Sequence, residues 1–258
     1  MFNPSLAADP LCTALRAGHH LTELPVAVRP QDRAQGYAVQ REWITRLGPA
    51  AGWKIAATSL AGQQHIAVSG PLAGPVFADR VQDAGAPVSL QANRMRVAEC
   101  EIVFRFGQDL PARSGGYTPQ EVRAAVDALA PGIEVPDSRF MNFEKAGEAQ
   151  LIADCACCRD MVLGHFMPVD ERMGTLAGLR VRATVNDGRE LEGIGSNVLG
   201  DPLAALLWFV NELSSVGQTL SRGQFVTTGA CVTPIPVLPG QKVEADFGWL
   251  GRLGVSFV

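Results

Sequence analysis

The stretch Val97–Phe106, VAECEIVFRF, decides the fold, because it alternates like a β-strand and yet places two acidic residues on one face. Alternation directs Glu99 and Glu101 to the same side of the strand, with their Cα atoms about 6.6 Å apart. The opposite side carries residues suited to a core: Ala98, Cys100, Ile102, Phe104 and Phe106. Two adjacent carboxylates repel each other and resist burial unless a positive charge lies between them. The acidic face is therefore either open to water or the site of a metal ion.

The composition indicates a compact protein that does not bind nucleic acid. The 258 residues are 47% hydrophobic and only 19% charged, which favours extensive buried surface, as in an oligomer. The formal net charge is −4, and the basic residues are scattered, so we expect no nucleic-acid partner. The chain has no apolar run of about 18 residues and no leader-like start, so we expect no membrane association and a cytoplasmic location. Its six cysteines are expected to be reduced thiols.

The first fifty residues differ in pattern from the rest. Residues 5–17 and 29–48 have helical periodicity, whereas short strands separated by Gly and Pro dominate from residue 51 onward. The regular strand–helix alternation of a doubly wound sheet is absent. We therefore predict an α+β fold in one integrated domain, with a helical N-terminal segment over 1–50 packed on a mixed, largely antiparallel β-core over 51–258.

Three local signals refine the β-rich part. Thr118–Glu121 is a capping box that predicts a helix ending at Pro131. Residues 179–193 alternate around an Asn-Asp-Gly turn and predict a hairpin. Asp201 followed by proline predicts a second helix, and residues 241–258 predict a closing hairpin.

A third acidic residue, Glu134, lies between Ile133 and Val135 in another apolar strand. Three carboxylates on adjoining strands form a site suited to a hard cation such as Mg²⁺ or Mn²⁺. The spacing alone is only moderately specific. The alternative is a solvent-exposed strand face on which Glu99 and Glu101 pair with Arg105.

Several motifs, in order along the chain, resemble one enzyme family. They are GWKIAATS (52–59), ECEIVFRF (99–106), IEVPDSRF (133–140), IADCACCRDMVLG (152–164), GSNVLGDPLAALLWFVNEL (195–213) and the C-terminal stretch 226–258. They resemble the 2-keto-4-pentenoate hydratase and 4-oxalocrotonate decarboxylase family within the fumarylacetoacetate hydrolase superfamily. The resemblance extends from about residue 30 to the end of the chain.

This resemblance implies a β-roll fold, a divalent metal that is usually Mg²⁺, and assembly into homo-oligomers. It implies that Glu99, Glu101 and Glu134 are metal ligands and that Lys54 is the active-site lysine. Asp79 lies near an acidic position of the family and is a candidate for an assisting catalytic role. The implied activity is metal-dependent addition of water to a 2-hydroxydienoate, such as 2-hydroxypenta-2,4-dienoate, giving a 4-hydroxy-2-oxo acid in aromatic catabolism.

The chain departs from the family pattern at two places. It has Ala56 where members typically have Gly after Lys-Ile, and DCACC over 154–158 where they often have DNASS. Thiols prefer apolar surroundings, so the substrate is expected to be larger or less polar at one end. Further substrate-binding candidates, Cys157, Ser196 and Thr228, lie in motifs that could approach the pocket.

Other residues in these motifs have simpler interpretations. We expect Asp137 and Arg139 to fix the turn after Glu134 through a local ion pair. The cysteines at 155, 157 and 158 lack the usual zinc spacing, and no base is evident beside them, so buried or pocket-lining thiols are favoured over a soft-metal site or a nucleophile.

Two rival functions stay open on sequence grounds. One is metal-dependent decarboxylation of a 2-oxo-enoate dicarboxylate such as 4-oxalocrotonate, which would need an added cationic or amide group for the second carboxylate. The other is a weakly active partner subunit in a complex with a sister family member. Three converging carboxylates and Lys54 argue against a purely structural subunit.

Overall fold

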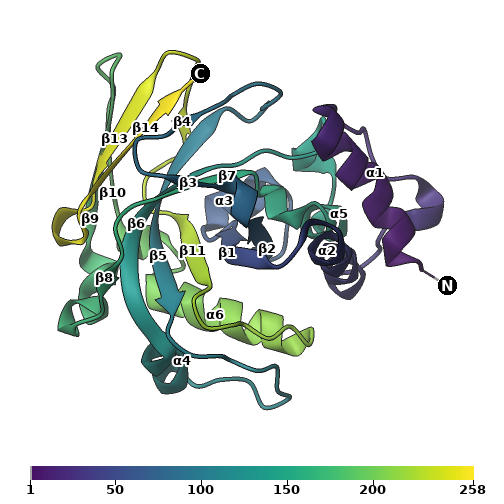
Figure 1. Cartoon of the computed structure of the whole chain (residues 1–258), viewed down its shortest axis with the longest axis horizontal. Coiled ribbons are helices and arrows are strands. Elements are labelled where there is room, and N and C mark those ends of the chain that lie inside the picture. Colours follow the sequence, from purple (N-terminus) through teal and green to yellow (C-terminus); the bar gives the residue numbers. More distant parts are fainter. Residues whose placement is uncertain (1) are drawn as a thin grey trace.

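The computed structural model describes residues 2–258; the expected helical segment begins at residue 1, which lies outside them. Two β-sheets make up the body of the protein (Figure 1). Seven strands of the larger sheet follow the order β2-β1-β11-β5-β6-β7-β3, and two short strands pair with β5 and β6. Its strands are β1 (Ala50–Ala56), β2 (Leu72–Phe77), β3 (Val81–Asp83), β5 (Val97–Phe106), β6 (Val126–Val135), β7 (Asp160–Leu163), β8 (Met167–Pro168), β11 (Phe225–Ala230) and β12 (Ile235–Pro236).

The smaller sheet has five strands in the order β10-β9-β13-β14-β4. They are β4 (Pro87–Val88), β9 (Arg180–Val185), β10 (Glu190–Ile194), β13 (Lys242–Asp246) and β14 (Arg252–Phe257). In the two sheets together, β1 with β11, β3 with β7, and β14 with β4 are parallel, and the other pairs are antiparallel. The predicted mixed, largely antiparallel β-core is therefore confirmed.

The apolar face of β5 lies in the main core, as its alternation predicts. The alternate residues Ala98, Cys100, Ile102, Phe104 and Phe106 are fully buried. The long strands β5 and β6 curve together through the centre of the molecule (Figure 1). Burial of this face fixes the register, because a one-residue slip would turn the acidic side chains into the core.

Helices cover two regions of the larger sheet (Figure 1). The helices α1 (Pro4–Ala17), α2 (Arg33–Leu47) and α5 (Glu148–Ala153) gather at one end, while α4 (Pro119–Ala125) and α6 (Pro202–Ser215) lie together at another. The short helix α3 (Leu60–His65) follows β1. Buried hydrogen bonds join α2 to its neighbours: Trp43 Nε1 donates to the Ala153 carbonyl at 3.0 Å, and Gln40 Nε2 to the Ala73 and Ile152 carbonyls, each at 2.6 Å.

The helix predicted from Thr118 to Pro131 is only half correct. The capping box is formed, but α4 ends at Ala125 and the chain continues directly into β6. Val122, Ala125, Val126 and Leu129 have helical spacing, yet pairing along nearly the whole of β5 outweighs that local preference. Pro131, expected to end a helix, instead lies inside a strand between two others.

The remaining predicted elements are present. Residues 180–194 and 242–257 form hairpins, and Asp201 caps α6 by accepting a hydrogen bond from Leu203 N at 2.9 Å. None of the helices described over residues 2–258 combines the length and apolar character needed to cross a membrane.

Candidate metal centre and active-site cavity

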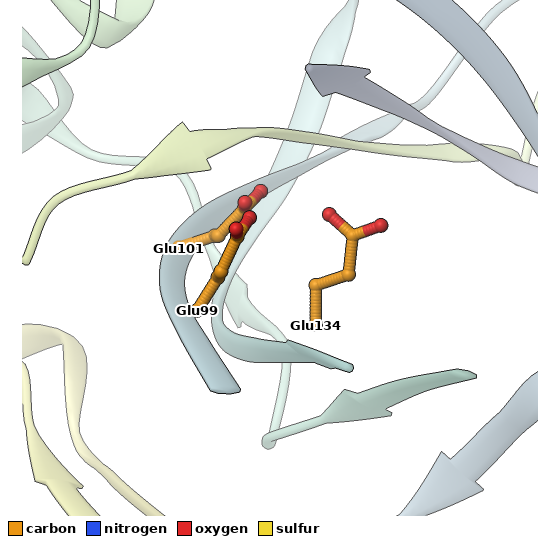
Figure 2. A group of neighbouring side chains, drawn as sticks. All are labelled: Glu99, Glu101 and Glu134. Atoms are coloured by element: carbon orange, nitrogen blue, oxygen red, sulfur yellow. The ribbon is translucent and has the colours of Figure 1, made fainter. Parts of the chain in front are cut away.

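Adjacent strands of the larger sheet bring three carboxylates together (Figure 2). Glu99 of β5 pairs directly with Glu134 of β6, and Glu101 lies two residues further along β5. Each glutamate offers an oxygen, and these oxygens all lie within 4.8 Å of one another. Figure 2 shows the two glutamates of β5 pointing the same way, with Glu134 across from them. The alternation of β5 and its register with β6 therefore create the cluster.

The oxygens of the cluster are only partly satisfied. Glu101 Oε2 accepts hydrogen bonds from Thr227 Oγ1 and, at 2.8 Å, from Gly229 N, both on β11. Among the residues described, Glu101 Oε1 and both oxygens of Glu134 are buried and accept no hydrogen bond. Buried polar atoms are normally paired. Lys54 faces Glu134 Oε1 at 3.2 Å, but Glu101 Oε1 and Glu134 Oε2 have no partner among the described residues, so they mark a position where a ligand is expected.

Lys54 supplies one positive charge beside the carboxylates. Its Nζ lies 3.2 Å from Glu134 Oε1 and donates to the Ala156 carbonyl at 3.0 Å. In a flat sheet β1 and β6 would be about 14 Å apart, three strand spacings. The two side chains meet because the sheet is curled and because both are long.

Burial strongly affects the charges of these groups. It raises the pKa of the Glu134 carboxyl to about 7 despite the opposing effect of Lys54, and it raises the pKa of Glu99 and Glu101 as well. Burial alone would lower the pKa of Lys54, but Glu134, Glu99 and Glu101 together hold it above its usual value. Lys54 is therefore an ammonium ion, and one such charge is too little to keep three clustered carboxylates ionised when two of them are buried.

Ala156, whose carbonyl accepts the hydrogen bond from Lys54, lies in a strained turn. Cys155, Ala156 and Cys157 have φ angles of 53°, 51° and 62°, a conformation that costs energy for residues other than glycine. The turn packs tightly on β2, where a Cβ on Gly74 would lie 1.9 Å from the Cys155 carbonyl oxygen. The strain is held in place by surrounding structure and directs the Ala156 carbonyl at Lys54.

A buried ion pair between Arg139 and Asp154 anchors this turn. Arg139 Nη1 also donates to the Cys158 carbonyl at 2.8 Å, and Ser138 Oγ to Asp154 Oδ2 at 2.7 Å. The prediction of an ion pair between Asp137 and Arg139 is therefore wrong, because the Arg139 guanidinium pairs with Asp154 instead. Asp137 instead pairs with Arg159 at 3.1 Å and accepts a hydrogen bond from Arg94 N at 2.9 Å.

A cavity of about 550 Å³ opens beside the cluster. Its lining includes Lys54, Glu99 and Cys157 among the residues considered from sequence. It also includes Asn197, the neighbour of Ser196, whose side-chain Nδ2 donates to the Cys231 carbonyl at 2.7 Å. The structure thus places the lysine, one carboxylate of the cluster and one thiol on the wall of a single cavity.

Glu101 and Glu134 lie behind Glu99 and outside the lining described, and so do three further candidates from the sequence. Asp79 has a side chain that is 75% exposed, close to Arg80 beyond the end of β2. Ser196 lies next to the cavity without lining it. Thr228 is buried, and its Oγ1 donates to the Ile102 carbonyl at 3.1 Å. Since its hydroxyl is directed to main chain, the neighbouring Thr227 is the threonine that reaches the cluster.

Sequence reasoning missed the groups that orient the cluster. The Gly229 amide and the Ala156 carbonyl are backbone groups, so no side-chain pattern identifies them. Gly229 has φ 104°, and a Cβ there would lie 1.9 Å from Thr58 Oγ1, so the Thr-Thr-Gly sequence was the available signal. The Arg139–Asp154 pair joins residues fifteen apart and depends on the tertiary fold.

The cysteines are buried and free. Burial raises the pKa of Cys157 to about 12, and it also raises the pKa of Cys155 and Cys158. Within residues 2–258, the group of potential metal ligands consists of the three glutamates and includes no cysteine. These observations favour neutral pocket-lining thiols over a nucleophile or a soft-metal site.

Comparison with known proteins gives a consistent result. Residues 54–258 match the family described as fumarylacetoacetate (FAA) hydrolase C-terminal. The chain is 29% identical to TodF product hydratase of Pseudomonas putida F1, covering 97% of this chain and 94% of that protein. It is 30% identical to a 4-oxalocrotonate decarboxylase of a Pseudomonas species, covering 80% and 77%. The solved structure of Pseudomonas putida G7 4-oxalocrotonate decarboxylase with magnesium and adipate aligns with a TM-score of 0.87, 25% identity and coverage of 100% and 99%.

The protection of the thiols leads to a testable expectation. The native protein should react with no more than a trace of a thiol reagent such as DTNB within minutes at pH 8, because all six cysteines are buried and their pKa values are raised. After unfolding in guanidinium chloride, six thiols per chain should react. Rapid reaction of a native thiol, located by mass spectrometry, would contradict the assignment for that cysteine.

Proposed function

Because this chain belongs to the fumarylacetoacetate hydrolase family, we propose that it is a divalent-metal-dependent hydratase acting on a 2-hydroxydienoate in aromatic catabolism. The expected product is a 4-hydroxy-2-oxo acid, formed from a substrate such as 2-hydroxypenta-2,4-dienoate. The observation that carries the proposal is the cluster of three converging carboxylates beside Lys54 at the edge of a cavity of about 550 Å³. Hydratases and decarboxylases of this family are both lyases, and so is this enzyme.

The residues fit a divalent cation. Glu99, Glu101 and Glu134 carry three negative charges when ionised and Lys54 one positive charge, which leaves a net charge of −2 to be balanced. The buried oxygens of Glu101 and Glu134 that accept no hydrogen bond are hard donors, which suit Mg²⁺ or Mn²⁺ better than a soft metal. We therefore assign these glutamates as the residues that would hold the metal.

The chemistry follows from the arrangement of charges. A bound divalent metal would polarise the 2-oxo group and stabilise negative charge that develops there during the reaction. Glu101 is held by Thr227 and Gly229, so its free oxygen keeps a fixed direction. Lys54 lines the cavity as an ammonium ion, positioned to bind the substrate carboxylate or to pass a proton to the reacting chain.

A direct assay tests this function. Freshly generated 2-hydroxypenta-2,4-dienoate should lose its dienol absorbance with Mg²⁺ present and keep it when EDTA is added, and the product mass should increase by one water. Loss of CO₂ from 4-oxalocrotonate, with no action on the dienoate, would instead establish the decarboxylase alternative. Absence of turnover on either substrate, in protein that binds Mg²⁺, would favour a partner-subunit role.

The oligomeric state and the cellular location of the enzyme are also open to test. We infer that the enzyme forms a homo-oligomer in the cytoplasm, and the alternative is a complex with a sister family member. Size-exclusion chromatography with light scattering gives the oligomeric state, and co-purification from the source cell identifies a sister subunit.

Substitution of Glu101 tests the metal ligands. In Glu101→Gln the amide oxygen can keep the hydrogen bonds from Thr227 and Gly229, while the NH₂ group replaces the unpaired oxygen. The fold should persist, and Mg²⁺ affinity measured by calorimetry should fall at least about 100-fold, which corresponds to about 2.7 kcal/mol. Glu192→Gln, exposed on β10, is the charge-matched control and should bind as wild type. Unchanged affinity in Glu101→Gln would remove Glu101 from the ligand set.

Substitution of Lys54 separates metal binding from turnover. Lys54→Met keeps most of the side-chain volume and removes the charge that competes for the Glu134 oxygen. Mg²⁺ should bind as tightly as in wild type or more tightly, whereas kcat should fall by about 100-fold or more, as for loss of a proton-transferring group. Lys242→Met, whose exposed side chain pairs with Glu244, is the control. Turnover near the wild-type rate in Lys54→Met would make the lysine structural.

A further inference from the structure

The cavity beside the carboxylate cluster is larger than the reacting head of a 2-oxo acid requires. Its volume of about 550 Å³ lies within the range of about 300–1,000 Å³ found for pockets that enclose drug-sized ligands. The chelating head of the substrate, a carboxylate with the adjacent 2-oxo group, needs only Lys54 and the metal cluster. The rest of the cavity is therefore available for the remainder of the substrate.

The lining of that remaining space is mainly apolar. Ile66, at the end of α3, and Leu72, at the start of β2, are buried there, and Phe143 and Met95 are half-buried. Such a lining stabilises a ligand in proportion to the apolar area that the ligand buries. Cys157 adds to this character, because its buried thiol is uncharged at neutral pH where family members often carry a hydroxyl.

To a second carboxylate the lining offers mainly neutral groups, among them the hydroxyls of Thr58, Ser59 and Thr233. Of the residues described, Lys54 is the sole lysine or arginine that lines the cavity, and it is already paired with Glu134. The side-chain amide of Asn197 donates to the Cys231 carbonyl. Ser59 Oγ accepts a hydrogen bond from Gly62 N, so it could offer a second carboxylate only the hydrogen bond of its own hydroxyl. An anion buried without a cationic partner is strongly disfavoured.

His65 is the remaining group that could carry positive charge in this lining. It is exposed, and its ring packs edge-on against Phe143, with ring centroids 5.8 Å apart. This contact uses the ring as part of the apolar wall. An exposed imidazole stabilises a bound carboxylate much less than a buried guanidinium would.

We propose that the enzyme is specific for monocarboxylic substrates with an alkyl or aryl group at the end remote from the 2-oxo acid, and that it discriminates against dicarboxylates. This inference rests on the proposed function and deepens it. The uncharged end would lie against Ile66, Leu72 and Phe143. Discrimination against a second carboxylate also separates the hydratase reaction from decarboxylation of a dicarboxylic 2-oxo-enoate.

Binding of unreactive saturated 2-oxo acids tests the proposal without requiring turnover. The Mg²⁺-loaded enzyme is titrated calorimetrically with 2-oxopentanoate, 2-oxohexanoate and 2-oxooctanoate, and with 2-oxoadipate, which matches the six-carbon acid but ends in a carboxylate. Affinity should rise about fourfold for each added methylene. 2-Oxoadipate should bind at least about tenfold more weakly than 2-oxohexanoate.

Variants of the cavity wall test which residues produce the preference for an uncharged substrate end. Phe143→Ala should bind 2-oxooctanoate several-fold more weakly while binding 2-oxopentanoate as before, and Phe143→Arg should improve binding of 2-oxoadipate. Leu60→Ala is the control, because Leu60 lies on α3 with 77% exposure and outside the lining described. His65→Leu should leave the preference intact.

The outcomes separate this inference from the proposed function. Binding of all four acids with no gain from tail length, tighter binding of 2-oxoadipate, or selective loss of 2-oxoadipate binding in His65→Leu would overturn the inference alone. Failure of every 2-oxo acid to bind the Mg²⁺-loaded enzyme would overturn the proposed function and this inference with it.

Discussion

The strongest constraint on this fold is the electrostatic cost of gathering three carboxylates around one point, two of them buried and the third, Glu99, half-buried. Burial raises the pKa of each glutamate, repulsion by neighbouring carboxylates raises it further at Glu101 and Glu134, and Lys54 offsets only part of this effect. The apo site is therefore charge-unbalanced, and the energy needed to maintain it must come from the surrounding fold. Binding of a divalent cation removes the imbalance, so the same residues that weaken the apo protein give the site its affinity.

The curled sheet makes this arrangement possible. Pairing of β5 with β6 places Glu99 opposite Glu134, while β11 supplies donors to one oxygen of Glu101 and leaves the other free. Curvature then brings Lys54 from β1 within reach of Glu134. Long-range strand pairing, rather than any loop, sets these distances, and rigid strands keep the ligand oxygens in a defined geometry.

The sequence predicts the parts of this site that depend on local pattern. Alternation places Glu99 and Glu101 on one face, and the chemistry of carboxylates links them to Glu134. The hairpins and the cap of α6 are also local, and they were predicted correctly. The switch from α4 to β6 at Val126 was not, because helical spacing there is overruled by pairing with β5. The strained turn and the Arg139–Asp154 pair escaped prediction for the same reason: tertiary contacts create them.

The cavity has a polar part, beside Lys54 and the carboxylate cluster, and an apolar part that is left for the rest of the substrate. This division would allow one type of metal centre to serve related reactions. In the proposed reaction, Glu99, Glu101 and Glu134 with a bound metal, together with Lys54, would recognise features that every 2-oxo acid shares, so they would not choose among substrates. Selection among substrates must therefore come from residues that contact the rest of the substrate. Here those groups are apolar side chains and the neutral thiol of Cys157, held in a turn that also positions Lys54 through the Ala156 carbonyl. A change in this turn would therefore alter substrate preference and lysine position together, which couples specificity to catalysis through a few adjacent residues.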